Sequence, residues 1–224
     1  MSPAAPEEPT ALRPAASLAA GESALRLALH ARLLGSPHEW DAATRVEVAE
    51  LGDWARSTLS DDTALADLLA VLPAPDDDAA AEAWARQYSA LFEVGSHGAP
   101  LPVREEHTAS AGGGSKEEVV RFYDLFGYEL APAYAWAPDH LAPMLEFLGW
   151  LAGLESGATD DDDRASLRRA QRDFIERHLW HWLPALALAV RSRDGAGPYV
   201  QVLDCLEATV RAERARLADE PEDA

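Results

Sequence analysis

The sequence of 224 residues has one cysteine, one lysine and no long hydrophobic segment. A single thiol, Cys205, cannot form a disulfide within the chain, which suits a reducing compartment. The longest apolar run, residues 183–190, contains Pro184 and is far too short to cross a bilayer. The first residues are rich in proline and glutamate and lack the apolar region of a secretory signal. We therefore expect a cytoplasmic protein without a membrane span.

Basic residues are also few, because 19 Lys and Arg stand against 39 Asp and Glu, which makes the formal net charge −20. Nucleic-acid binding rewards clustered basic side chains through counterion release, and an anionic membrane would repel this chain. We therefore expect neither nucleic acid nor a membrane surface as a partner. A basic peptide would instead be attracted. The acidic excess fits such a partner, and it equally fits plain solubility or adaptation to salt.

Strands are not indicated either, because no stretch alternates apolar and polar residues for long enough. Apolar residues recur with the helical period instead, and the predicted fold class is all-α. We expect helices over residues 18–34, 42–59, 62–72, 79–92, 116–126, 139–154, 163–191 and 198–217. Pro184 should break the longest of these near Leu183, because proline lacks an amide donor and clashes with the preceding turn.

The pattern predicts one helical domain over residues 16–217, between a disordered tail at 1–15 and an acidic, frayed tail at 218–224. Residues 95–115 hold five of the 14 glycines and have no period, which predicts a long loop. Residues 156–163, SGATDDDD, are predicted to be a polar linker. Helices could be exchanged across such a linker, so we expect a monomer or a helix-swapped dimer.

Motifs for metal, phosphate or nucleophile chemistry are weak. His178 and His181 have a spacing that suits two metal ligands, but no third ligand is near them in the sequence. The acidic run at 160–163 lacks the spacing of a calcium loop, and GGGSK at 112–116 lacks the first glycine of a phosphate-binding loop. Cys205 lies in an apolar helical pattern and should pack in the core. We predict no catalytic residue, no cofactor and no metal.

One stretch contains polar residues that packing does not explain. In PDHLAPMLEFLGWLA, residues 138–152, the apolar positions fall on one helix face, whereas Asp139 and His140 begin the helix and Glu146 lies on the back face. Asp139 could cap the helix or bind a ligand. Glu146 is in mid-helix, where capping is impossible, so it should form a surface ion pair or contact a ligand.

Aromatic residues cluster in the same half of the chain. Most of them should pack in the core. A groove for a peptide would nevertheless need the same mixture, an apolar floor with a rim of carboxylates. The candidate residues for such a groove are Asp139, His140, Glu146, Tyr88, Leu91, Phe92, Phe122, Tyr123, Trp136 and Leu141.

Five segments occur in an informative order. They are QYSALFEVG (87–95), GAPLPVREE (98–106), EEVVRFYDLFGYEL (117–130), PDHLAPMLEFLGWLA (138–152) and FIERHLWHWLPALALAV (174–190). Together they resemble the TorD/DmsD/NarJ family of chaperones for molybdenum-containing oxidoreductases. The likeness is greatest to the delta-subunit chaperones of dimethyl sulfide, ethylbenzene, selenate or chlorate redox enzymes. Two residues depart from the family pattern, since Met144 stands where an acidic residue is usual and Arg104 where an aromatic residue is common.

The resemblance implies an all-helical TorD-like fold and a function that is not enzymatic. Such a chaperone binds the twin-arginine signal and the apo-form of the catalytic subunit, assists molybdenum cofactor insertion and holds back export. Asp139, His140 and Glu146 match the family positions tied to signal-peptide recognition, and residues 88–92 match its other signature. The two carboxylates could accept charge-assisted hydrogen bonds from guanidinium groups.

Two functions of other classes are consistent with the same residues. The first is a small helical enzyme or regulator that binds a nucleotide or metal through Asp139, His140 and Glu146, which calorimetry with guanine nucleotides and divalent metals would detect. The second is a structural subunit that stays in the mature complex, which co-purification after export would detect.

Overall fold

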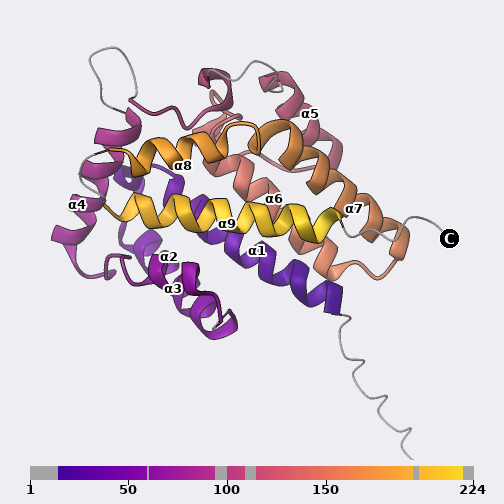
Figure 1. The fold of residues 1–224 in the computed structure, drawn as a ribbon, viewed down its shortest axis with the longest axis horizontal. Helices are drawn as coiled ribbons and strands as arrows, with labels where there is room; N and C mark the ends of the chain where they lie inside the picture. The colour runs from indigo at the N-terminus through magenta and orange to yellow at the C-terminus, as the bar shows by residue number, and fades with distance from the viewer. Residues whose placement is uncertain (1–14, 60, 94–99, 109–114, 194–196, 219–224) are drawn as a thin grey trace, which may run out of the picture.

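The computed structural model describes residues 15–59, 61–93, 100–108, 115–193 and 197–218, which form an all-α bundle (Figure 1). The α-helices of these residues are α1 (Ala15–Leu34), α2 (Ala42–Thr58), α3 (Thr63–Leu69), α4 (Asp78–Tyr88), α5 (Lys116–Phe126), α6 (Leu141–Gly157), α7 (Asp161–Phe174), α8 (Leu183–Arg191) and α9 (Pro198–Ala218). Shorter 3-10 turns are η1 (Pro37–Glu39), η3 (Glu105–His107) and η4 (Pro132–Tyr134), and π-helical turns are η2 (Ser89–Glu93) and η5 (Ile175–Leu179).

The predicted fold class is confirmed, since the described residues contain no strand beyond an isolated bridge. The predicted tails lie outside the described residues, apart from their inner ends in α1 and α9, and so do most residues of the predicted loop at 95–115. None of the described helices is both long and apolar enough to span a membrane.

Acidic side chains begin many of the helices. Asp41, Asp62 and Asp77 each accept a hydrogen bond from the backbone amide three residues further on, at 2.8, 3.0 and 2.9 Å. Asp160 accepts from the amides two and three residues on, at 2.9 and 3.2 Å. A carboxylate at this place satisfies free amides and faces the positive end of the helix dipole. The acidic run predicted as a linker is therefore the beginning of α7.

The helices α1 and α6 form the central contact of the bundle. Gly149 allows them to approach closely, because a Cβ atom there would lie 3.3 Å from the Ala24 carbonyl oxygen and 3.3 Å from the Leu27 Cβ. The helix α9 packs against α1, α3, α7 and α8, and Figure 1 shows it running beside α8 across the bundle. Its buried Tyr199 brings α9 into the core next to α4, with the Trp84 ring centre 5.1 Å away.

The predicted helix over residues 163–191 is broken, as Pro184 indicates. After α7 comes the π-helical turn η5, and α8 begins at Leu183 with Pro184 in its first turn. Proline is tolerated there because its missing amide would have no partner within the helix. Between the two helices, the Trp182 indole donates a hydrogen bond to the His178 carbonyl at 2.6 Å.

Residues 100–108, the described part of the predicted loop, are tied to the bundle. The Leu141 amide donates to the Val103 carbonyl at 2.8 Å, and the Glu105 amide donates to the Asp139 carbonyl at 3.1 Å. The Glu105 side chain is buried and accepts a hydrogen bond from His178 Nδ1 at 3.0 Å. These bonds hold residues 103–105 against the beginning of α6.

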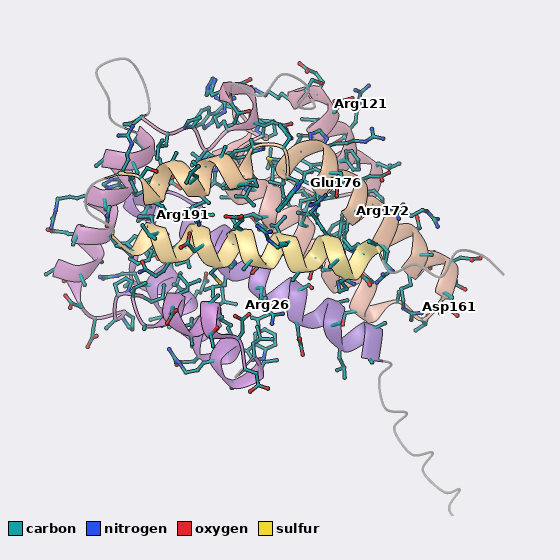
Figure 2. All side chains as sticks on the ribbon, in the orientation of Figure 1. Arg26, Arg121, Asp161, Arg172, Glu176 and Arg191 are labelled. Atoms are coloured by element: carbon teal, nitrogen blue, oxygen red, sulfur yellow. The ribbon has the colours of Figure 1, made fainter. Side chains whose placement is uncertain are left out.

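Charged groups join the helices at the other end of α6. The Glu155 carboxylate is fully buried and accepts hydrogen bonds from Arg216 at 2.7 and 3.0 Å, from Arg168 at 3.2 Å and from Gln171 at 2.8 Å. This network connects α6, α7 and α9. Figure 2 shows an exposed link of the same kind, in which Arg191 at the end of α8 reaches α9.

Candidate functional site

The helix α6 begins two residues later than predicted, and His140 is its N-cap. The His140 Nδ1 accepts a hydrogen bond from the Ala142 amide at 3.1 Å, so the neutral ring carries its proton on Nε2. That nitrogen lies 3.5 Å from the Tyr88 hydroxyl, which donates to the Leu34 carbonyl at 3.2 Å. Burial lowers the pKa of His140 to about 4, which keeps the ring neutral at pH 7.

The interpretation of Asp139 as a helix cap is wrong, because its side chain is bound elsewhere. Its Oδ1 accepts hydrogen bonds from Arg104 Nε at 3.3 Å and Nη2 at 3.1 Å, and its Oδ2 accepts from the Glu106 amide at 3.0 Å. The Arg104 guanidinium also lies over the Trp136 ring, 5.2 Å from its centre. A fully buried carboxylate is thus neutralised by an arginine of the same chain.

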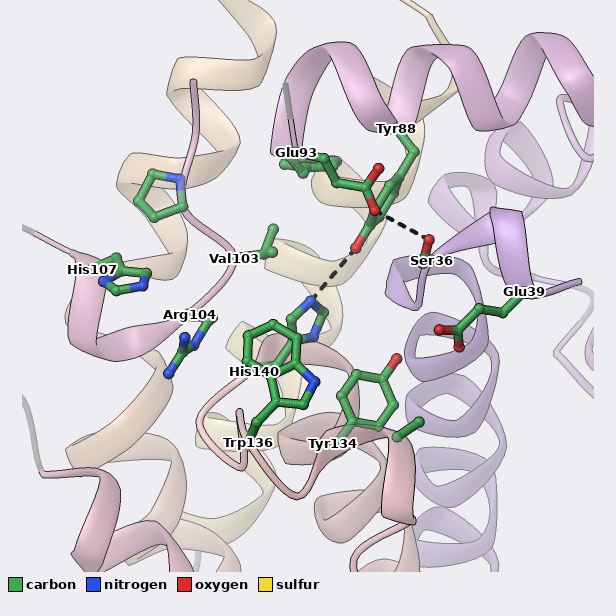
Figure 3. Close-up of a pocket in the computed structure, with 13 residues that line it drawn as sticks. Ser36, Glu39, Tyr88, Glu93, Val103, Arg104, His107, Tyr134, Trp136 and His140 are labelled. Carbon is green, nitrogen blue, oxygen red and sulfur yellow. Dashed lines mark hydrogen bonds between the residues drawn. The ribbon is translucent and has the colours of Figure 1, made fainter. Parts of the chain in front are cut away.

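A cavity of about 460 Å³ opens in front of the α6 N-cap. Figure 3 shows the rings of Tyr134 and Trp136 on one side and the Tyr88 hydroxyl on the other. The Glu39 and Glu93 side chains come from η1 and η2 at its edge. The walls therefore combine aromatic surface with carboxylates, from segments that are far apart in the sequence.

A second cavity of about 250 Å³ adjoins the first and shares Ser36, Glu39 and Tyr134 with it. Glu146 lines this second cavity and is exposed, as a residue on the back face of α6 should be. Together with burial, its carboxylate raises the pKa of Tyr128. We call the two adjoining cavities the acidic groove, and its carboxylates are Glu39, Glu93 and Glu146.

Negative charge dominates the acidic groove. Within the described part of the chain, Glu39 and Glu146 have no basic partner within 4.0 Å, and Glu93 is 3.8 Å from the exposed His38. The two arginines that line the groove are already paired with carboxylates outside it. Arg32 lies 3.9 Å from Glu47, and Arg104 lies 3.1 Å from Asp139. A cationic ligand would therefore meet carboxylates that the protein does not itself neutralise.

The structure brings half of the predicted site residues to this groove. Those that line it are Tyr88, Phe92, Trp136, His140 and Glu146. The rest lie elsewhere, with Asp139, Tyr123 and Leu141 buried and Leu91 and Phe122 half-buried in the packing of the helices. The Tyr123 hydroxyl donates to the Pro138 carbonyl at 2.8 Å, so this buried aromatic residue stabilises the turn before α6.

The residues of the alternative site do not converge. Asp139 is occupied by Arg104, His140 faces the first cavity, and Glu146 faces the second. Among the described residues, no group of three or more His, Cys, Asp and Glu is arranged to hold a metal ion. His178 and His181 lie instead beside the buried Glu105, at 3.0 and 3.6 Å.

The groove also contains residues that were not predicted from the sequence, among them Glu39, Glu93 and Tyr134. Glu93 directly follows Phe92 in a segment that the sequence does single out, so its position was available as a signal. Glu39 and Tyr134 have no such signal, because they meet only when η1 after α1 packs beside η4 before α6.

Comparison with known proteins identifies a family and several relatives that this chain resembles. A family model described as nitrate reductase delta subunit matches residues 56–187. The selenate reductase assembly chaperone protein of Thauera selenatis is 37% identical over 137 residues, which are 60% of this chain and 70% of that protein. The chlorate reductase assembly chaperone protein of Ideonella dechloratans is 34% identical over 139 residues, 61% of this chain and 71% of that protein.

A shorter match links the chain to the chaperone protein TorD of Photobacterium profundum, which is 33% identical over 82 residues, 37% of this chain and 38% of that protein. No solved structure matches the chain significantly. The names of these relatives are those of chaperones and not of catalysts, which agrees with the non-enzymatic function predicted from the sequence.

Proposed function

This chain belongs to the nitrate reductase delta subunit family, the NarJ/TorD family, and we propose on that basis that it is a cytoplasmic maturation chaperone for a molybdenum-containing oxidoreductase. In this proposal it binds the apo-form of the catalytic subunit through the twin-arginine signal region. It thereby assists insertion of the molybdenum cofactor and delays export until insertion is complete.

The observation that carries this proposal is the acidic groove. Guanidinium groups bind carboxylates through paired, charge-assisted hydrogen bonds, and Glu39 and Glu146 are carboxylates without a basic partner among the described residues. The rings of Tyr134 and Trp136 line the same groove and can cover the aliphatic part of an arginine. Such a surface selects a cationic and partly apolar segment.

The predicted site residues take different roles in this proposal. Glu146 accepts hydrogen bonds from a client arginine, and His140 and Tyr88 form the floor of the groove. Asp139 acts indirectly, because it holds Arg104 in place beside the exposed Trp136 ring. The exposed fraction of Trp136, 65%, leaves much of that indole available to a ligand.

Titration with a peptide that contains two arginines followed by an apolar stretch tests the proposal. Wild type should bind it, and Glu146→Gln should weaken binding by about tenfold, because a charge-assisted hydrogen bond becomes a neutral one. The salt dependence of binding should flatten in the variant. Thermal stability should stay nearly the same, since Glu146 is exposed.

The matched control is Glu50→Gln, which removes the same charge from an exposed position on α2 that does not line the groove. It should bind the peptide nearly as wild type does. Absence of binding by wild type, or equal losses in the two variants, would contradict a specific role for the groove. A large fall in melting temperature for Glu146→Gln would make that residue structural.

A further inference from the structure

A third cavity adjoins the acidic groove and differs from it in polarity. It has a volume of about 350 Å³ and lies between residues 101–108 and the first turns of α8. No Asp, Glu, Arg or Lys is among the described residues that line it. Its apolar walls come from Leu101, Pro102, Trp182, Ala185, Leu186 and Ala189. We call it the apolar cavity.

The α8 wall of the apolar cavity is one face of the helix, because residues 182, 185, 186 and 189 follow the spacing of that face. Trp182 and Leu186 are buried and fixed by the core, whereas Ala185 is exposed. The short alanine side chain leaves space that a larger residue would fill. Leu188, also on α8, is 59% exposed and does not line the cavity.

The three cavities form an ordered series. The apolar cavity shares Pro102 and His107 with the first cavity of the acidic groove, and that cavity shares Glu39 with the second. Of the described residues that line the three cavities, those with carboxylates belong to the groove, and none lines the apolar cavity. A segment in which arginines precede an apolar stretch fits this order in one orientation, with its arginines in the acidic groove and its apolar stretch in the apolar cavity.

We propose that the apolar cavity binds the apolar stretch that follows the arginines of the client segment. The segment then lies with its arginine end at Glu39 and Glu146 and its apolar end against Ala185 and Leu186. This inference rests on the proposed function and adds to it the direction of the bound chain and a separate site for its apolar part. Complementary charge at one end and apolar contact at the other specify this occupant.

A polar side chain placed in the apolar cavity tests the inference. Ala185→Gln should weaken binding of the complete peptide about 5- to 10-fold, because it fills the cavity and leaves apolar surface of the ligand in water. Binding of a shortened peptide with the arginines but without the apolar stretch should not change. Leu188→Gln introduces the same residue on α8 outside the cavity and should bind both peptides as wild type does.

The same titrations separate this inference from the proposed function. If wild type fails to bind the complete peptide, or if Glu146→Gln binds it as tightly as wild type, the proposed function is wrong. If Glu146→Gln weakens binding but Ala185→Gln does not, the groove binds the client and the apolar cavity does not. Both Ala185→Gln and Leu188→Gln should give cooperative melting curves, and these curves should coincide. A difference in binding between the two variants then cannot come from unfolding of one of them.

Photo-crosslinking tests the direction of the bound segment. A benzophenone at the apolar end of the peptide should attach to residues 100–108 or 183–191, and one at the arginine end to residues 36–40. The reverse pattern would overturn the proposed direction.

Sedimentation without peptide tests whether a second copy of the chain occupies the apolar cavity instead. If wild type is a dimer and Ala185→Gln is a monomer, the cavity belongs to the dimer interface and the inference is overturned.

Discussion

Asp139 shows how a buried charge can be satisfied by a residue remote in the sequence. Both carboxylate oxygens are used, one by Arg104 and one by the Glu106 amide, and none of the side chain is exposed. Arg104 stands where an aromatic residue is common in the family that the sequence resembles. The place beside Asp139 that the sequence assigns to a client arginine is therefore filled by Arg104 of the chain itself.

Arg104→Ala should lower the free energy of unfolding by about 3–5 kcal/mol, because it leaves a buried carboxylate without a partner. Urea denaturation would measure this loss. The control is Arg121→Ala, which removes an exposed arginine 3.9 Å from Glu118 and should change stability by less than about 1 kcal/mol. Similar losses in the two variants would show that the Asp139 pair contributes little.

His140 makes stability depend on pH. Burial lowers its pKa from 6.5 to about 4 in the folded state, so between these values the unfolded chain binds more protons than the folded one. The free energy of unfolding should therefore fall as the pH falls from about 6.5 to about 4, by up to about 3 kcal/mol from this residue. His30 is also buried, with a pKa of about 4, and acts in the same direction.

His140→Asn should reduce that pH dependence without removing the helix cap, because the asparagine oxygen can accept the Ala142 amide in place of Nδ1. Denaturant unfolding at several pH values from 4 to 7 would show a shallower slope, with His30 accounting for a part that stays. If the slope of His140→Asn equals that of wild type, His140 is not a source of the pH dependence.

At the scale of the helices, the contact between α1 and α6 depends on a missing side chain. A Cβ atom at Gly149 would approach the Ala24 carbonyl oxygen and the Ala28 amide nitrogen to 3.3 and 3.4 Å, and backbone atoms move only if a whole helix moves. Gly153 is on the same helix, but a Cβ atom there would meet nothing within 4 Å.

Alanine at these two positions should have effects of opposite sign. Gly149→Ala should destabilise the protein by about 1–3 kcal/mol through overpacking, and Gly153→Ala should stabilise it by about 0.5–1 kcal/mol, because alanine favours the helix. Thermal and urea unfolding of the two variants would measure both changes. Stabilisation by both variants would show that helix propensity, and not the α1/α6 contact, decides the outcome.

Most helices are predictable because their apolar period is local information. The helix α5 was predicted with its observed bounds, and Pro184 correctly indicated the break before α8. The beginning of α6 was misplaced because Asp139 is a good capping residue by type, and only the folded chain brings Arg104 to it. Glu146 was recognisable from the helical period as a residue on the back face of a helix. The position of Glu39 in the groove was not, because it depends on how η1 packs.

At the scale of the whole molecule, the formal charge of −20 has more than one use. Part of the acidic excess caps helices, as at Asp41, Asp62, Asp77 and Asp160. The remainder still creates a field that attracts cations over a distance comparable to the Debye length. The proposed monomer or helix-swapped dimer, which stays a prediction, would carry this field in either form.

The association rate of the twin-arginine peptide should therefore fall roughly tenfold as salt is raised from low to high concentration, whereas its dissociation rate should change little. Stopped-flow or surface-based kinetics would measure both. Glu146→Gln should act mainly on dissociation, because its carboxylate touches the ligand, and Glu50→Gln should cause only a small change in association. A dissociation rate that carries most of the salt dependence would contradict attraction by the overall field.

The position of α9 has a consequence for biosynthesis. This helix packs against α1, α3, α7 and α8, and its Arg216 donates two of the hydrogen bonds that Glu155 accepts. A nascent chain that still lacks α9 exposes the surfaces that this helix will cover and holds Glu155 without the Arg216 guanidinium. Completion of the native core must therefore wait until α9 has left the ribosome.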